Sequence, residues 1–345
     1  AWPGAVADAP RPPPSQPAFT PPTPGALLAT KTRLLFALPW RRFKKGAVLA
    51  VDLQGSVGDK RGGRFSSALT LPQLTRALEK AAYDPRVSGV YLKVGPLGAG
   101  WAKLQEVVAH IHLFRASGKP VYAYVERGGE KEYYVASAAS RLFTPPTGGV
   151  SLRGMTVAGT YVRAALDKAG VEPEVRRIGK FKSAGDQLLR SDMSGAQREQ
   201  LTAILDDVHA SFCAAVASHR GKSAADVESL LDAAVYEPQE LLEGGWVDGL
   251  AYEDEVVESM RVACQGLDPN PSLQDQAASG LPFSMPARWA APAEGGEAPG
   301  KPPKVKGLAV VPLKKYSFVS PTAFGLSGAS GCDPWGGRAG GRVRV

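Results

Sequence analysis

Residues 71–94 read LPQLTRALEKAAYDPRVSGVYLKV, and this stretch joins a helix signal to a strand signal. Leu74 and Leu78 recur at helical spacing, which predicts a helix over Leu71–Tyr83. Val87–Val94 is a short apolar run of the kind found in buried strands. A helix followed closely by a buried strand is typical of a sheet whose strands are connected by helices.

The same alternation extends on both sides of this stretch. Further strands are predicted at 48–53, 121–125, 142–143 and 174–178, and further helices at 101–114, 133–139, 161–168, 196–218, 224–233 and 253–262. Strands that alternate with helices are connected by crossovers, and such strands lie parallel to one another. The fold class that we predict is therefore α/β with a mostly parallel sheet.

The composition is that of a soluble globular protein. The chain has 345 residues, of which 44% are hydrophobic and 21% charged, so a collagen, a wholly disordered chain and a disulfide scaffold are all excluded. Its apolar runs, such as Leu34–Leu38 and Ala47–Val51, are far shorter than the roughly 18 to 20 residues that a membrane-spanning helix needs. The sequence predicts no transmembrane helix.

The net charge of +8 comes from the two ends of the chain. Residues 1–45 have seven basic and one acidic residue, and residues 301–345 have eight and one, so the region between them is mildly acidic. No aromatic RNA-binding motif, zinc-finger spacing or recognition-helix pattern accompanies the charge, and nucleic acid is not an expected partner. A basic end beside an anionic membrane surface is the better electrostatic hypothesis.

The tails differ in composition from the middle of the chain. A Pro-rich, disordered leader is expected over residues 1–33, and its composition is compatible with a remnant of an organellar targeting region. The apolar residues 34–40 run into the basic cluster 41–45, which suits either a membrane interface or a packed N-terminal arm. A Pro/Ala/Gly-rich linker is predicted over 266–304. Residues 305–345 are expected to form a short edge strand near 305–313 and a disordered Gly/Arg-rich tail.

No cofactor or metal is expected from the remaining motifs. The glycines at 54–63 fit neither GxGxxG nor GxxxxGK[ST]. The cysteines lack CxxC spacing and the histidines lack an HExxH motif, so they are interpreted as packed or surface residues: Cys213, Cys264, Cys332, His110, His112, His209 and His219.

Residues 177–187, RIGKFKSAGDQ, are the best candidate for chemistry. Glycines flank Lys180 and Lys182, and small residues after Lys182 leave its amine accessible. A lysine acts as a general base only when its pKa falls from about 10.4 toward neutrality, through desolvation or a neighbouring cation such as Lys180. From spacing alone, a solvated basic loop remains the alternative.

Four motifs in order resemble the signal peptide peptidase A (protease IV) family, in its plant and algal chloroplast form. They are KAAYDPRVSGVYL at 80–92, GWAK at 100–103, GEKEYY at 129–134 and the stretch 179–194. The similarity spans about residues 34–265, with a weaker echo in KKYS at 314–317. It implies one ClpP/crotonase-like domain over 34–265, in a family whose long members have two such domains in tandem.

The resemblance also implies a serine-type endopeptidase with a Ser-Lys dyad that degrades signal peptides. Lys182 matches the lysine that accepts the serine proton, and in the long members the serine lies in the second domain. Glu130 stands where single-domain relatives have the nucleophile. The second domain is expected to be absent from this chain, which predicts an inactive half that needs a serine from elsewhere. Ser183, Ser137 and Ser140 are poor substitutes, the first because side chains of adjacent residues diverge and the others because they lie in a helix pattern.

By resemblance, the expected partners are peptide substrates, a peripheral contact with the thylakoid membrane of the chloroplast, and further copies of the chain in a homo-oligomer. Two alternative functions stay open. One is a non-catalytic assembly domain of the same fold, which the missing serine favours. The other is a crotonase-type acyl-CoA enzyme, although the sequence has no identifiable CoA signature.

Overall fold

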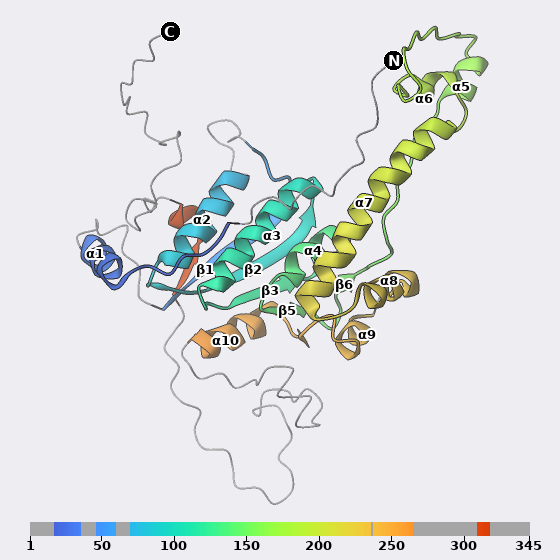
Figure 1. The fold of residues 1–345 in the computed structure, drawn as a ribbon. Coiled ribbons are helices and arrows are strands. Elements are labelled where there is room, and N and C mark those ends of the chain that lie inside the picture. The colour runs from blue at the N-terminus through green and yellow to red at the C-terminus, as the bar shows by residue number, and fades with distance from the viewer. Residues whose placement is uncertain (1–16, 36–45, 60–69, 236, 265–308, 318–345) are drawn as a thin grey trace, which may run out of the picture.

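The structure is a computed structural model that describes residues 17–35, 46–59, 70–235, 237–264 and 309–317. Its centre is a six-stranded sheet with the order β7-β5-β3-β2-β1-β8, in which all neighbouring strands pair in parallel (Figure 1). The prediction of a parallel α/β sheet is confirmed. The strands are β1 (Ala47–Gly55), β2 (Val87–Leu97), β3 (Val121–Val125), β5 (Arg141–Thr144), β7 (Gly249–Leu250) and β8 (Val310–Pro312).

Helices cover both faces of the sheet. On one face lie α2 (Leu71–Tyr83), α3 (Trp101–Ala116) and α4 (Glu130–Ser137), and on the other lies α10 (Glu253–Cys264) (Figure 1). Because side chains alternate along a strand, Leu49 packs in the cluster under the first three helices, while Val48 packs against α10. Burial on both faces explains the continuous apolar strands.

Most predicted helices are confirmed. Helix α2 and helix α8 (Ala224–Ala233) have the predicted bounds, and α3, α7 (Gly195–Arg220) and α10 extend the predicted ranges by no more than two residues at either end. The remaining elements are α1 (Pro24–Leu35), β4 (Arg127–Gly128), β6 (Gly149–Val150), α5 (Arg163–Lys168), α6 (Asp186–Leu189), α9 (Pro238–Glu243) and α12 (Leu313–Tyr316). Strands β4 and β6 form a separate parallel pair.

Several expectations need correction. Residues 174–178 do not form a strand, because they are largely exposed and pair with no described strand. Helix α4 covers 130–137 rather than 133–139, and α5 begins two residues after the predicted 161. The predicted edge strand at 305–313 is β8, with 305–308 lying outside the described residues.

The predicted leader also differs from the structure where residues are described. Helix α1 begins at Pro24, a position where proline needs no amide partner. Before it, the ring of Phe19 lies 4.9 Å from that of Tyr83, and the Thr20 N–H donates to the Tyr83 hydroxyl (3.3 Å). Phe19 and Thr20, within the predicted leader, therefore contact the body of the protein. Residues 1–16, the linker 266–304 and the tail 318–345 lie outside the described residues.

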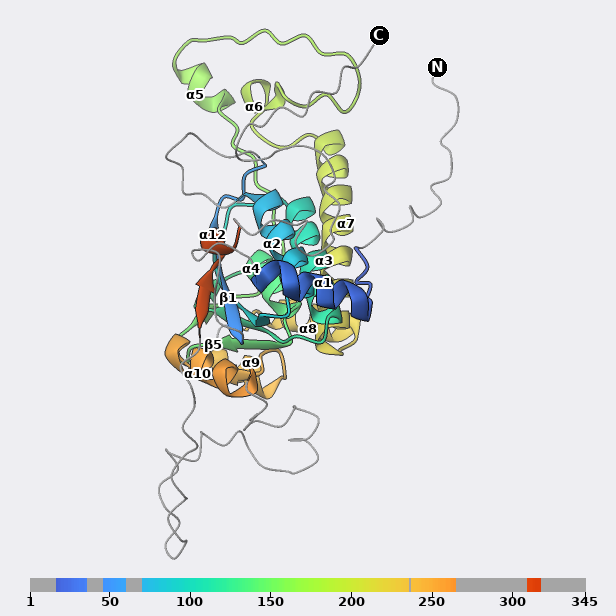
Figure 2. The same ribbon diagram turned by 90° about the vertical axis from the view of Figure 1, so that its left-hand side faces the viewer.

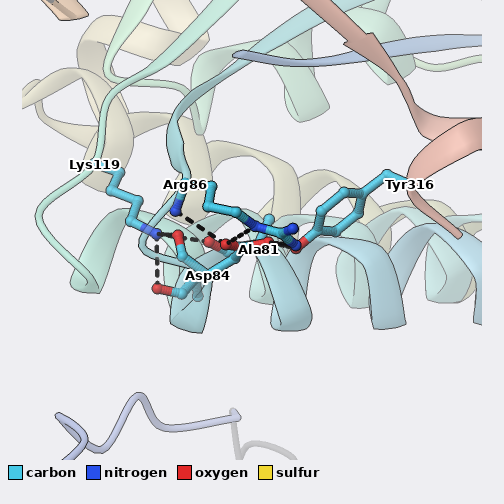
Figure 3. Close-up of polar contacts among 6 residues, drawn as sticks. Ala81, Asp84, Arg86, Lys119 and Tyr316 are labelled. Atoms are coloured by element: carbon cyan, nitrogen blue, oxygen red, sulfur yellow. Dashed lines mark hydrogen bonds and ion pairs between the residues drawn. The ribbon is translucent and has the colours of Figure 1, made fainter. Parts of the chain in front are cut away.

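A buried polar cluster joins the KAAYDPR motif to the last described segment (Figure 3). The Asp84 carboxylate, with no exposed surface, pairs with Arg86 (2.8 Å) and accepts a hydrogen bond from the Tyr316 hydroxyl (3.1 Å). Lys119 donates to the carbonyl oxygens of Ala81 (2.7 Å) and Asp84 (2.7 Å), which caps the C-terminus of α2. The motif that supports the resemblance thus fastens α12 and β8 to the sheet.

Candidate active site

An arm made of residues 153–211 projects from the body of the protein. Figures 1 and 2 show α5 and α6 beyond the end of α7 that points away from the sheet. Within this arm only Asp186 and Ser194 are buried. The arm therefore draws little stability from a hydrophobic core of its own, and its shape depends on α7 and on a few polar contacts.

Helix α7 supports the arm at both ends. Its N-cap is Ser194, whose hydroxyl accepts the Gln197 N–H (3.3 Å), and it ends at Gly221 in the left-handed conformation (φ 63°). Phe212 and Val216, near its C-terminus, are buried in the main core. By length and hydropathy alone α7 is able to span a membrane, but its C-terminal half packs as a core helix does.

The loop with the two candidate lysines is held closed by Asp186. One carboxylate oxygen of Asp186 pairs with Arg177 (2.7 Å), and the other accepts a hydrogen bond from the Ser194 hydroxyl (2.9 Å). These two contacts join the segments on either side of Lys182. Gly185 is needed for the same closure, because a Cβ there would lie 2.5 Å from Val175 Cγ1. The loop thus presents Lys182 in a defined turn.

The Lys182 side chain is exposed at the outer end of the arm. Its backbone N–H donates to the Gly179 carbonyl (3.4 Å), and within the described part of the chain its amine has no hydrogen bond or ion pair. Lys180 differs, because it pairs with Glu199 (2.9 Å). Three exposed apolar side chains surround this loop in sequence: Ile178 (93% exposed), Phe181 (47%) and Leu188 (41%).

Position 130 carries a carboxylate at the first turn of α4, at the carboxyl end of the strands. Glu130 Oε1 accepts the Arg153 N–H (2.8 Å). The buried Glu132 carboxylate accepts the N–H groups of Leu97 (2.6 Å) and Gly129 (2.7 Å). Acidic groups are favoured at a helix N-terminus. The Glu132 carboxylate therefore satisfies two backbone N–H groups beside the first turn of α4.

A hydrogen-bonded chain of Ser137, His219 and His112 was not expected from the sequence. Ser137 Oγ lies 2.9 Å from His219 Nδ1, and His219 Nε2 lies 2.9 Å from His112 Nε2. The Ser137 hydroxyl also donates to the Tyr134 carbonyl (3.0 Å). Ser137 has no exposed surface, so a substrate carbonyl cannot reach it in this conformation. The set therefore joins α3, α4 and α7 rather than forming a reactive nucleophile.

The surroundings of His219 and His112 favour the neutral form of both imidazoles. Burial, and then the neighbouring His112, Arg115 and Arg220, lower the pKa of His219 to about 3. Burial and Arg115 also lower the pKa of His112. No sequence signal brings these histidines together, because they are 107 positions apart on two helices.

The structure also describes Ser183 and Ser140, the other two serines considered as nucleophiles. Ser183 follows Lys182 directly and is half-buried. Ser140 lies after the end of α4 rather than within a helix, and its hydroxyl oxygen accepts the Val121 N–H (3.2 Å). Neither shares a hydrogen bond with a lysine amine within the described residues.

Residues 113–266 match the sequence model of peptidase family S49. This chain carries a peptidase family S49 domain. The match covers α4, the arm and the body that follows it. The predicted resemblance to the signal peptide peptidase A family is confirmed at this level.

The S49 domain also has similar curated relatives. The whole chain is 42% identical over 235 residues to the chloroplastic serine protease SPPA of Arabidopsis thaliana, covering 68% of this chain and 35% of that protein. It is 31% identical over 170 residues to protease 4 of Salmonella typhi, covering 48% of this chain and 28% of that protein. The chain thus spans about a third of the length of these relatives.

Solved structures also align with this chain. A mutant of a membrane-bound stomatin-specific protease aligns with a TM-score of 0.38 and 15% identity, over 63% of this chain and 85% of that chain. An enoyl-CoA hydratase/carnithine racemase from Magnetospirillum magneticum aligns with a TM-score of 0.36 and 14% identity, over 69% of this chain and 77% of that chain. Scores at this level support no functional argument.

Among the described residues, the amine of Lys182 and a serine hydroxyl do not form a hydrogen-bonded pair. A solvent-facing lysine amine is held on the arm, whereas position 130 has a carboxylate. In serine peptidases the hydroxyl and its base must be within hydrogen-bond reach. The described residues therefore do not form a complete catalytic pair.

Proposed function

We propose that this S49 domain is the lysine-bearing part of a serine-type endopeptidase with a Ser-Lys dyad. The serine would lie outside the described residues, on a further domain or a partner chain. The observation that carries the proposal is the loop around Lys182, which Asp186 holds closed while the amine stays accessible. A simple solvated loop would not need a carboxylate with 1% exposure to fix its shape.

In the proposed reaction the neutral amine of Lys182 accepts the proton of the serine hydroxyl. The serine oxygen then forms a bond to the peptide carbonyl carbon, and backbone N–H groups stabilise the resulting oxyanion. The lysine returns its proton to the leaving amine as the peptide C–N bond breaks. Water then hydrolyses the acyl-enzyme, with the same lysine acting as base.

Docking of the serine-bearing segment would also make Lys182 a better base. An exposed lysine is almost fully protonated at neutral pH, because its ordinary pKa is about 10.4. The exposed side chains of Ile178, Phe181 and Leu188 lie beside Lys182 in the chain. A segment that covers them would exclude water from the amine and lower its pKa. Base activation and assembly would then be the same event.

The test is an assay of an unstructured apolar peptide with this chain alone, and with this chain plus a serine-bearing S49 second domain. We expect cleavage only in the mixture, and loss of cleavage in Lys182→Met. The matched control is Lys180→Met, two residues away on the same loop, which should keep most of the activity.

Cleavage by the mixture that survives Lys182→Met would overturn the assignment of the base. Cleavage by this chain alone, persisting after removal of trace proteases, would overturn the need for an outside serine. The binding of the two polypeptides is measured in parallel by analytical ultracentrifugation, so that failed assembly is not mistaken for failed chemistry.

A non-catalytic assembly domain is the second candidate function. The observation that favours it is Glu132, whose carboxylate occupies the Leu97 and Gly129 N–H groups. Under this alternative, the mixture of polypeptides forms a complex in which Lys182→Met leaves any cleavage unchanged. The crotonase-type alternative has no support from the described site, and calorimetry with an acyl-CoA tests it directly.

The proposed setting is the chloroplast, with peripheral attachment to the thylakoid membrane and assembly into a homo-oligomer. The curated relative from Arabidopsis is named chloroplastic, which supports the compartment. The exposed apolar residues of the arm support self-association. Sedimentation of the chain gives the oligomeric state, and co-sedimentation with anionic vesicles at low and high salt tests the membrane contact. A chain that sediments as a monomer and does not bind the vesicles would refute both the homo-oligomer and the membrane attachment.

A further inference from the structure

Three side chains with metal-ligating atoms meet where α8 packs against α7. His209 and Cys213 are four positions apart on α7, which places them on one face of the helix. Glu228 comes from α8. One ligand atom from each of the three lies within 4.8 Å of the others. A search for CxxC or HExxH motifs does not find these three residues. Only His209 and Cys213 are close in sequence, and they form a His-x-x-x-Cys pair.

The distances suit a tetrahedral metal ion. His209 Nε2 lies 3.7 Å from Cys213 Sγ. Zinc binds imidazole nitrogen at about 2.0–2.1 Å and thiolate sulfur at about 2.3 Å, so two such ligands at a tetrahedral angle are roughly 3.5 Å apart. Only a small adjustment is needed for this pair. Glu228 is exposed, and its flexible side chain can move the remaining distance without disturbing the core.

The chemistry of the three donors selects the class of metal. Thiolate and imidazole favour zinc and related transition metals, whereas calcium and magnesium prefer oxygen ligands. Cys213 is buried, His209 is half-buried and Glu228 is exposed, so the ion would enter from the solvent side. Burial and the Glu228 carboxylate raise the pKa of the Cys213 thiol. A bound cation would reverse that effect by stabilising the thiolate.

We propose that His209, Cys213 and Glu228 bind one Zn²⁺ ion, with water in the fourth position. On binding, the Cys213 thiol releases its proton to solvent and its sulfur bonds to the metal. The ion would link α7 to α8 close to the point where α7 enters the core at Phe212. Its expected role is to fix the base of the arm. This proposal stands independently of the proposed peptidase activity.

The test uses the full chain with Cys264→Ser and Cys332→Ser, so that Cys213 is the only cysteine left of the three. After treatment with a chelator, Co²⁺ is added as a spectroscopic probe. We expect a near-ultraviolet thiolate-to-metal charge-transfer band with visible bands of tetrahedral cobalt, both displaced by Zn²⁺. We also expect Zn²⁺ to raise the Tm of this protein.

Variants at the two less buried ligands keep the test independent of core packing. His209→Gln and Glu228→Gln should each weaken Co²⁺ binding at least about tenfold, the lower end of what even outer partners of a metal site contribute. His110→Gln is the matched control and should bind as the parent does. Absence of the charge-transfer band at saturating Co²⁺ would overturn the site. Unchanged affinity in either His209→Gln or Glu228→Gln would overturn the three-ligand assignment.

Discussion

Acid should destabilise this protein through the buried pair of His112 and His219, and His219→Gln should remove much of that effect. Donor and acceptor positions explain why. The Ser137 hydroxyl donates to the Tyr134 carbonyl, so its oxygen accepts a hydrogen from His219 Nδ1. His219 Nε2 is then an acceptor that takes the hydrogen of His112 Nε2. A second proton on His219 would face a donor instead of an acceptor.

The cations around the pair act in the same direction. After burial and the neighbouring His112, Arg115 on α3 and Arg220 on α7 both disfavour a charge on His219. The pKa of His219 is lowered from 6.5 to about 3. Below about pH 6.5 the imidazole of His219 therefore binds a proton in the unfolded chain but stays neutral in the folded chain. Stability is complete above that pH and is lost as the pH falls toward 3.

The size of the loss follows from the pKa difference. Between pH 7 and pH 5, a histidine with these two pKa values costs about 2 kcal/mol of the free energy of unfolding. We expect urea unfolding at pH 7, 6 and 5 to show this additional slope in the wild-type protein but not in His219→Gln. His110→Gln, on the same helix as His112, should keep the wild-type slope. An identical pH dependence in wild type and His219→Gln would refute the reasoning.

Three further changes test the contacts described above. Asp186→Asn should open the loop of Lys182, which increases proteolytic cleavage of the arm and lowers the activity of the assembled peptidase, whereas Asp192→Asn, in an exposed pair, should change neither. Tyr316→Phe removes one hydrogen bond from a buried carboxylate and should lower the free energy of unfolding by about 1–2 kcal/mol in urea. Glu132→Ala leaves two backbone N–H groups without their acceptor and should cost about 2–4 kcal/mol; a stability equal to wild type would contradict this account.

The sheet and its helices could be predicted because their signals are local. Helix α2 has apolar residues at helical spacing, and the structure reproduces its predicted bounds. The buried strand that follows begins at the predicted Val87 and extends to Leu97, beyond the predicted Val94. The arm was harder to predict. The alternation at 174–178 suggested a strand, but a strand forms only where another strand offers its backbone, and the arm extends away from the sheet. Periodicity does not report where a segment lies in space.

In the candidate site, too, features with a local sequence signal could be predicted, and features that join distant segments could not. Lys182 was identified through a motif, and the structure adds what the motif does not state, namely that Asp186 and Gly185 hold the loop in shape. The Ser137, His219 and His112 chain was missed because its members come from three helices. The His209 and Cys213 pair had a usable signal, since a separation of four places both side chains on one face of a helix.

The position of the proposed base on the arm has a mechanistic consequence. If Lys182 lay in the core, it would be desolvated permanently, and the chain would carry a reactive base at all times. On the arm its side chain is exposed, so it is desolvated only when another surface covers it. Under the proposed function, proteolytic activity is then limited to the assembled state. The arm is the part of the described structure with the least burial, and in this scheme it is also the part whose burial on assembly generates the catalytic base.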